Sequence, residues 1–234
     1  MIDSNILTSI FSTEKEANPL KKGKPKEQMR LIVYGSANTG KSFLVRSILD
    51  TLKDKALVVA PNGMAASEVG GVTIEDAFNI PKTSNWNFRV SKEERRWLEH
   101  DGPLSKIDYL LIDNFNMVGS RMLHHIDERC RIAKTADKDK NHLYFGGMNV
   151  ILFTDFAQLS PDNDSPVWLQ PQSEEKDPLG FTESGYLVYR SFKTVIFLEK
   201  VMNCKDHRFV EVLENIRNGI ALKEDFDYIK DNSL

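Results

Sequence analysis

Residues 35–42 constrain this chain more than any other feature: they read Gly-Ser-Ala-Asn-Thr-Gly-Lys-Ser and directly follow an apolar run at 31–34. Gly35 and Gly40 allow the backbone to turn so that successive N–H groups face one centre. An apolar repeat follows at 44–52, so the segment is predicted to join a buried strand to a helix N-terminus, where anions bind. The pattern therefore predicts a phosphate-binding P-loop.

Each position of this loop has a chemical reason to contact a nucleotide. Lys41 is expected to place its positive charge against the β- and γ-phosphates. Ser42 is expected to offer a hydroxyl to Mg²⁺, which prefers hard oxygen ligands. ATP and Mg²⁺ are therefore the expected cofactors. The candidate nucleotide-binding residues are Gly35, Ser36, Ala37, Asn38, Thr39, Gly40, Lys41 and Ser42.

The rest of the chain alternates short apolar runs with helical repeats. The runs are continuous and rich in β-branched residues, which is typical of strands buried on both faces of a parallel sheet. They occupy residues 31–34, 56–60, 109–113, 150–153 and 195–198, and the helical repeats occupy 44–52, 122–133 and 209–216. We expect one α/β domain over residues 30–234, a mostly parallel sheet flanked by helices, with residues 1–29 as an N-terminal extension.

Composition argues against several classes of function. The net charge is −3, so bulk charge does not favour nucleic acid, and any such contact would need a local groove. Two cysteines, Cys130 and Cys204, do not form a disulfide framework. No apolar run could span a bilayer and no signal peptide is recognisable, so we expect an intracellular protein, nuclear or cytoplasmic, with no membrane partner. The basic run at 21–26 is either a nuclear localisation signal or a solvated linker.

Acidic residues stand where two of the buried strands should end. Asp113 ends the run at 109–113, and Asp155 follows the run at 150–153. A P-loop domain uses a carboxylate at such a position to hold Mg²⁺ through water. Acids are also common as plain strand ends, so both residues are candidates for the metal site together with Ser42.

Beyond the P-loop, several sequence blocks follow one another in a characteristic order and spacing. They are Ala60-Pro-Asn-Gly-Met-Ala-Ala66, Gly70-Gly-Val-Thr-Ile74, Leu111-Ile-Asp-Asn-Phe-Asn-Met-Val118, Phe145-Gly-Gly147, Asp155-Phe-Ala-Gln-Leu-Ser-Pro161, Leu198-Glu-Lys-Val201 and Ile216-Arg-Asn-Gly219. Together they resemble the PIF/RecD-type DNA helicases, including the helicases of Helitron transposons. Several blocks in order are far more specific than any single motif.

This resemblance implies a RecA-like fold and, within this chain, the first motor domain only, because we expect no second RecA-like domain before Leu234. The family couples ATP hydrolysis to 5′-to-3′ movement on single-stranded DNA. By position in the matching blocks, Gln158 would sense the γ-phosphate. Asp113 would belong to the Mg²⁺ shell with Ser42.

Two positions depart from the family at groups that carry out hydrolysis. Asn114 stands where the family has a Glu that acts on the attacking water, and an amide cannot accept a proton. Asn203 stands where the family has an arginine, a residue worth roughly a thousand-fold in rate. With Gln158, these are the candidate catalytic positions. We expect that ATP hydrolysis is impaired and that the P-loop still binds the phosphates.

The DNA side departs from the family as well. Asn62 replaces a Thr expected to touch a backbone phosphate, and Glu75-Asp76 replace His-Ser, so contacts with single-stranded DNA should be weakened. Asn38 replaces a Gly of the P-loop, a change that Asn tolerates. Three hypotheses remain open: a motor domain active with partners, a helicase-derived pseudoenzyme that serves a protein partner in a nucleotide-dependent way, and a decayed domain without a nucleotide role.

A histidine pair, His124-His125, lies within the helical repeat at 122–133. Zinc-binding histidines on a helix are commonly four residues apart, so an adjacent pair does not predict a metal site. We expect a surface or partly buried pair.

The aromatic residues Trp86, Phe88 and Trp97 are a second cluster outside the P-loop. They could stack on bases, but we expect them to pack a subdomain between two helices. The neighbouring basic pair, Arg95-Arg96, keeps a single-strand contact open as the alternative.

Overall fold

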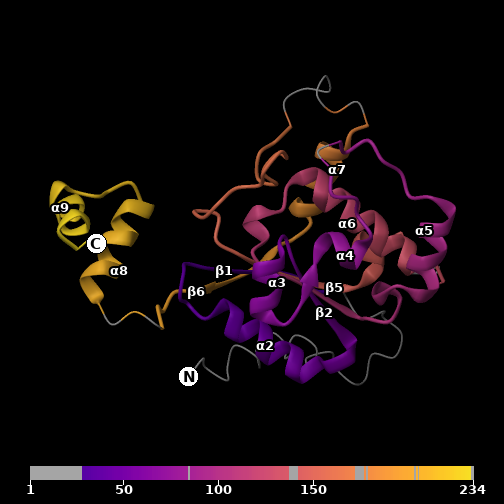
Figure 1. The fold of residues 1–234 in the computed structure, drawn as a ribbon, viewed down its shortest axis with the longest axis horizontal. Coiled ribbons are helices and arrows are strands. Elements are labelled where there is room, and N and C mark those ends of the chain that lie inside the picture. The colour runs from indigo at the N-terminus through magenta and orange to yellow at the C-terminus, as the bar shows by residue number, and fades with distance from the viewer. Residues whose placement is uncertain are drawn as a thin grey trace.

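The computed structural model describes residues 28–83, 85–136, 142–171, 177, 179–202, 204 and 206–232. Within them, a six-stranded sheet runs in the order β3-β2-β4-β5-β1-β6, and each neighbouring pair is parallel (Figure 1). Parallel neighbours need crossover connections, which the helices provide. The prediction of a mostly parallel α/β sheet flanked by helices is therefore confirmed.

Strands and helices alternate along most of the chain. The strands are β1 (Arg30–Gly35), β2 (Ala56–Ala60), β3 (Val72–Thr73), β4 (Tyr109–Ile112), β5 (Asn149–Thr154) and β6 (Thr194–Leu198). The helices are α2 (Lys41–Leu52), α3 (Gly63–Val69), α4 (Ile74–Phe78), α5 (Lys92–Arg96), α6 (Ser120–Ala133), α7 (Phe181–Arg190), α8 (His207–Arg217) and α9 (Lys223–Asn232). None of the helices in this described part of the chain is long and apolar enough to cross a membrane.

The helical repeats at 44–52, 122–133 and 209–216 correspond to α2, α6 and α8. The sequence pattern does not predict the helices α3, α4, α5, α7 and α9 or the two-residue strand β3. Short elements such as β3 take their conformation from pairing with a neighbour, here β2, rather than from their own periodicity.

Both faces of the sheet are covered. Leu31 and Val33 of β1 belong to the hydrophobic cluster that includes α2, while Ile32 between them belongs to the cluster that Leu123 and Ile126 of α6 join. Successive strand residues point to opposite faces, so a strand with two covered faces needs apolar residues throughout. This is the physical reason for the continuous apolar runs.

The aromatic residues of the segment before β4 are partly covered by protein. Phe88 and Trp97 pack against the larger cluster, and Trp86 lies with its ring centroid 6.4 Å from that of Phe88. Arg121 of α6 stacks its guanidinium 5.5 Å from the Trp86 ring. These contacts favour the packing interpretation of the cluster over base stacking.

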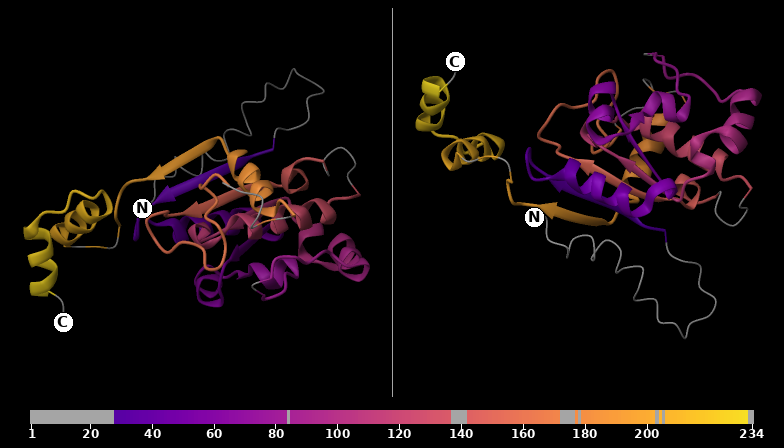
Figure 2. Two further views of the ribbon diagram at one scale, coloured as in Figure 1. Left: turned by 90° about the horizontal axis from the view of Figure 1, so that it is seen from above. Right: turned by 60° about the horizontal axis from the view of Figure 1, so that its bottom comes forward.

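Helices α8 and α9 stand apart from the sheet, beyond the carboxyl end of β6 (Figure 2). The buried carboxylate of Asp225 joins them, accepting hydrogen bonds from Arg208 at 2.8 Å and Asn215 at 3.1 Å. Six apolar side chains on this pair and its connecting turn are exposed: Phe209, Leu213, Ile216, Ile220, Leu222 and Phe226. Clustered exposed apolar residues often mark a contact surface.

Helices α6 and α7 approach each other most closely where Gly185 meets Ser120. A Cβ atom on Gly185 would lie 1.7 Å from the Ser120 carbonyl oxygen, so glycine is required for this contact. Ser120 begins α6 and is fully buried. The packing of α7 onto α6 therefore depends on the absence of a side chain at this position.

We predict that Gly185→Ala lowers the free energy of unfolding by about 1–3 kcal/mol or more, because the added methyl group forces α7 away from α6. Urea denaturation measures the change. The matched control is Gly63→Ala in α3, where an added Cβ meets nothing within 4 Å. That control should leave stability unchanged or raise it by up to about 1 kcal/mol. Equal effects of the two substitutions would contradict the close α6–α7 contact.

Candidate nucleotide-binding site

The P-loop connects the carboxyl end of β1 to the N-terminus of α2, as its sequence predicts. Gly40 and Asn38 adopt positive φ angles of 94° and 63°, which curl the loop. The Thr39 hydroxyl donates to the Ser36 carbonyl at 2.8 Å. A Cβ on Gly35 would lie 2.4 Å from that same hydroxyl oxygen, so the tight turn also requires glycine there.

Lys41 lies at the centre of this loop. Its Nζ donates hydrogen bonds to the carbonyls of Gly35 at 2.7 Å and Ser36 at 2.9 Å. Burial lowers the pKa of Lys41, and the charges of Asp155 and Asp113 oppose that shift. The ammonium group is thus held next to two carboxylates at the place where the loop turns.

The end of β4 supplies a buried carboxylate with an unused oxygen. Asp113 is 3% exposed, and its Oδ1 has no hydrogen-bond partner among the described residues. Thr154, at the end of the neighbouring strand β5, has a buried hydroxyl that also lacks a hydrogen-bond partner among the described residues. Burial raises the pKa of Asp113, while the backbone N–H of Asn114 and the charge of Lys41 lower it. Buried oxygens without partners are rare and fit a hard cation such as Mg²⁺.

Asn114 follows Asp113 in the left-handed backbone region, with φ 48° and ψ 42°, and begins a 3₁₀ turn at Phe115–Met117. Asn occupies this region more easily than other residues that carry a Cβ. Asn114 is partly exposed, so its side chain lies at the edge of the site rather than in the core.

The end of β5 carries a second carboxylate that is fully engaged by protein. Arg217, the last residue of α8, donates to both oxygens of Asp155, at 2.7 Å and 2.5 Å, and to the Tyr34 hydroxyl at 3.1 Å. Gln158 also donates to Asp155, at 2.9 Å. Although burial opposes ionisation, the hydrogen bonds from Arg217, Gln158 and the backbone N–H of Ala157 hold the pKa of Asp155 below its ordinary value.

The segment after β6 also reaches the P-loop. The backbone N–H of Met202 donates to the Asn38 carbonyl at 2.8 Å. Asn203, one of the predicted catalytic positions, lies outside the described residues. Together with Arg217, this bond joins the C-terminal helices to the candidate site at two points.

Most residues of this candidate site were predicted from the sequence, but the contact of Arg217 with Asp155 was not. The structure brings the P-loop, Asp113 and Asp155 to one edge of the sheet, and it places Gln158 against Asp155. Arg217 was named only as part of the block that ends in Gly219, and nothing in its local sequence indicates a partner 62 residues away.

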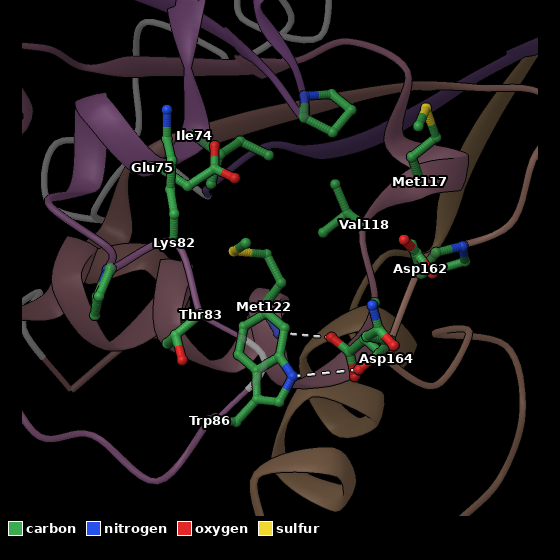
Figure 3. Close-up of a pocket in the computed structure, with 15 residues that line it drawn as sticks. Ile74, Glu75, Lys82, Thr83, Trp86, Met117, Val118, Met122, Asp162 and Asp164 are labelled. Atoms are coloured by element: carbon green, nitrogen blue, oxygen red, sulfur yellow. Dashed lines mark hydrogen bonds between the residues drawn. The ribbon is translucent and has the colours of Figure 1, made fainter.

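Of the residues predicted to weaken DNA contacts, Glu75 lines a separate pocket of about 350 Å³ (Figure 3). Glu75 lines this pocket opposite Asp162, and Lys82 stands beside it. Asn62 uses its side-chain oxygen to cap α3, accepting from the Ala65 N–H at 2.9 Å. Asp76 accepts a hydrogen bond from the Thr73 hydroxyl at 2.7 Å.

The fold and this loop together define a RecA-like P-loop domain, and solved Pif1 helicase structures are similar to it in fold. A family model described as PIF1-like helicase matches residues 18–225. The chain belongs to the PIF1-like helicase family, which confirms the resemblance found in the sequence blocks.

Several relatives support this assignment. The ATP-dependent DNA helicase PIF1 of Saccharomyces cerevisiae is 30% identical over 191 residues, covering 79% of this chain and 21% of that protein. The PIF1 helicase of Candida albicans is 30% identical over 200 residues, covering 81% of this chain and 21% of that protein. The chain thus spans about a fifth of the length of these curated relatives.

Solved structures agree over nearly the whole chain. Bacteroides Pif1 bound to ssDNA has a TM-score of 0.68 and 25% identity, covering 99% of this chain and 50% of that one. Pif1 helicase from Candida albicans has a TM-score of 0.71 and 23% identity, covering 99% of this chain and 46% of that one. The second likeness shows the fold alone.

We predict that Arg217→Ala lowers the free energy of unfolding at pH 7 by about 2–3 kcal/mol, because Asp155 keeps its charge but loses a bidentate partner. The lowered pKa of Asp155 means that the pair stabilises the fold above the ordinary carboxyl pKa, and that this contribution is lost as pH falls through the lowered value. The difference between the two proteins should therefore shrink towards low pH. Denaturation at several pH values measures it.

Arg190→Ala is the control, since Arg190 is an exposed residue of α7 that contacts Tyr186. Hydrogen exchange adds a second measurement: the amides of α8 should exchange faster in Arg217→Ala than in the control. A pH-independent difference, or unchanged exchange in α8, would contradict the role assigned to the pair.

Proposed function

We propose that this chain binds ATP with Mg²⁺ as the first motor domain of a PIF1-like DNA helicase and hydrolyses ATP slowly by itself. The observation that carries the proposal is the P-loop with Lys41 at its centre and, at the same edge of the sheet, the Oδ1 of Asp113 after β4, which has no hydrogen-bond partner among the described residues. The proposed domain covers residues 30–234, with residues 1–29 as an extension.

Each group has a proposed task. Residues 35–42 hold the phosphates through backbone N–H groups, and Lys41 supplies charge to the β- and γ-phosphates. Ser42 and Asp113 hold Mg²⁺, which would neutralise phosphate charge when bound. Gln158 would sense the γ-phosphate, and its contact with Asp155 links that residue to Arg217.

Slow hydrolysis follows from the two substituted positions. Asn114 can hold a water molecule by hydrogen bonds but cannot take its proton. Asn203 cannot supply the positive charge that an arginine would bring to the transition state. Arg217 does not substitute for it in the described arrangement, because its guanidinium is occupied by Asp155.

Single-stranded DNA is the proposed polymer partner, since a relative was solved bound to ssDNA. We expect weak binding, because Glu75 and Asp162 add negative charge to the lining of the pocket in Figure 3. Since the relatives are DNA helicases, the proposed location is inside the cell, in the nucleus or the cytoplasm.

A second candidate function is a pseudoenzyme that presents a surface to a protein partner in a nucleotide-dependent way. The exposed apolar residues of α8 and α9 favour it, because Arg217 and the Met202–Asn38 hydrogen bond connect this surface to the P-loop. Bound nucleotide could then bias the position of these helices without turnover.

We predict that Lys41→Ala weakens ATP–Mg²⁺ binding by about 10- to 100-fold, the effect of removing charge-assisted hydrogen bonds. Isothermal titration with a slowly hydrolysed ATP analogue measures affinity, and phosphate release is followed on the same sample. The matched control is Arg46→Ala, an exposed position of the same helix. Equal affinity of wild type and Lys41→Ala would remove both candidate functions.

We predict that Asn114→Glu combined with Asn203→Arg raises the rate of phosphate release, by about 100-fold or more if the restored base acts as general bases usually do. The control is Asn114→Gln with Asn203→Arg, which has a similar shape but no proton acceptor. Both variants place a longer side chain at a positive φ, so their folding cost is shared. Fast release by the wild type with single-stranded DNA would contradict impaired hydrolysis.

A further inference from the structure

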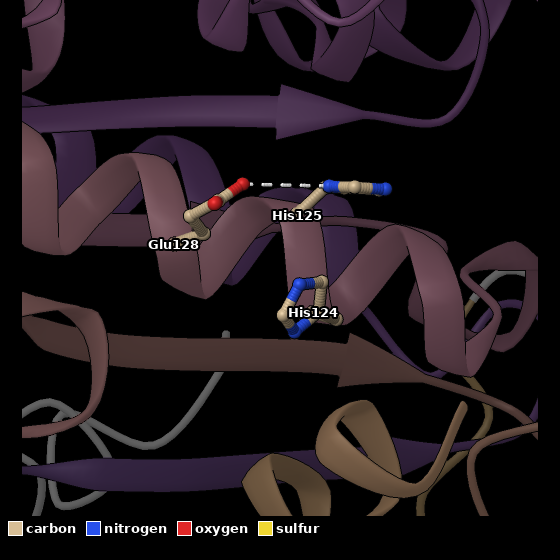
Figure 4. A group of neighbouring side chains, drawn as sticks. All are labelled: His124, His125 and Glu128. Atoms are coloured by element: carbon tan, nitrogen blue, oxygen red, sulfur yellow. Dashed lines mark ion pairs between the residues drawn. The ribbon is translucent and has the colours of Figure 1, made fainter. Parts of the chain in front are cut away.

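A group of metal-binding side chains lies on α6. It comprises His124, His125 and Glu128, and one ligand atom from each lies within 4.8 Å of the others. Figure 4 shows His125 turned towards Glu128, with His124 beside it on the same helix. The sequence predicted a surface or partly buried pair of histidines; His124 is half-buried, but His125 is fully buried.

His125 has one ring nitrogen satisfied and one not. Its Nε2 lies 3.3 Å from the Trp86 carbonyl oxygen, and because a carbonyl can only accept, Nε2 must carry the hydrogen. In a neutral ring this leaves a lone pair on Nδ1, which is buried without a hydrogen-bond partner and lies 3.6 Å from Oε2 of Glu128. The Nδ1 lone pair is buried, whereas the Glu128 side chain is 37% exposed, so a cation that reaches Glu128 from solvent could bind between the two atoms, as could a proton on Nδ1.

The surroundings of His125 hold its ring in this orientation. The ring stacks on Phe88 with centroids 4.2 Å apart. A metal-binding histidine usually donates its other ring N–H to a carbonyl or carboxylate, which fixes both tautomer and orientation. The contact between His125 and Trp86 has that form.

His124 is held by contacts with α7. Its Nδ1 lies 2.8 Å from the Ser184 hydroxyl of α7, and its ring stacks on Phe181 at 4.4 Å. The hydroxyl can accept from or donate to the ring, so His124 can present a lone pair without breaking its contact with α7. The two histidines therefore connect α6 to different neighbours.

The net charge of the residues around Glu128 favours the binding of a cation. Arg129 lies 3.4 Å from Glu128 and 3.1 Å from Glu94, so it neutralises one of these two carboxylates. With both histidines neutral, the group carries one negative charge in excess. A pocket of about 390 Å³ gives access from solvent, and its lining includes His124, Glu128 and Ser184. Two arginines also line it, and each has its own carboxylate: Arg95 pairs with Glu99, and Arg131 pairs with Asp127.

We propose that His124, His125 and Glu128 bind a Zn²⁺ ion, with water from the pocket completing the coordination. Two imidazoles and a carboxylate form a ligand set that zinc commonly takes. In a tetrahedral site with bonds of about 2.0–2.1 Å, ligand atoms lie roughly 3.3 Å apart, so ligand atoms that are now up to 4.8 Å apart must approach by up to about 1.5 Å. All three ligands lie on α6, so the ion would fix the orientations of two histidines that contact α7 and the Trp86 segment.

The test is a titration of the whole chain, freed of metal with a chelator and kept without nucleotide, by Zn²⁺ and by Co²⁺ as a coloured probe. Wild type should bind one ion with visible d–d bands typical of nitrogen and oxygen ligands. Glu128→Gln and His124→Ala should each weaken binding by about 100-fold or more, because each removes a ligand from a three-ligand site. Both positions are only partly buried, so folding can be checked by circular dichroism.

Matched controls separate this site from the other groups that bind zinc. His207→Ala and Cys204→Ser remove ligands near the start of α8, and His142→Ala removes an exposed histidine. Asp113→Asn removes the proposed Mg²⁺ ligand. Zinc binding that survives these four changes and fails in the two α6 variants supports the proposal. Absence of binding by the wild type, equal binding by the α6 variants, or loss in Cys204→Ser would overturn it.

Discussion

Every group at the candidate nucleotide site depends on the parallel pairing of β1, β4 and β5, because parallel strands bring their carboxyl ends to one edge. The P-loop follows β1, Asp113 follows β4, and Asp155 follows β5. A shift of one residue in register would turn the apolar side chains of a strand to the wrong face. The hydrophobic clusters on both faces thus hold the site together by fixing the register.

The Asp155–Arg217 pair extends this arrangement to the C-terminal helices. Two short bonds from one guanidinium give the pair a defined geometry as well as energy. Gln158 donates a hydrogen bond to Asp155, and the charge of Asp155 acts on Lys41. A few contacts therefore connect the candidate phosphate site to α8. The same pair keeps a positive charge close to the site without aiming it at the phosphates.

Structural features that depend on residues close in sequence were easier to predict than those that depend on contacts between distant segments. The P-loop, the parallel strands and the helices α2, α6 and α8 could be predicted, because each leaves a pattern within a short stretch of sequence. Helix α7 was missed because its packing depends on Gly185 fitting against Ser120, which no periodicity records. The histidine pair was misjudged in part, since spacing alone did not reveal that Phe88 and Trp86 bury His125.

By itself, the sequence determined that this chain forms a phosphate loop between a buried strand and a helix, and its ordered blocks identified the family. Such features depend on residues that are close together in the sequence, so they can be recognised from the order of residue types alone. Only the tertiary structure decided that Arg217 occupies Asp155, that an oxygen of Asp113 is left unpaired, and that Glu128 faces His125. These contacts depend on how distant elements pack, and packing is a property of the whole fold.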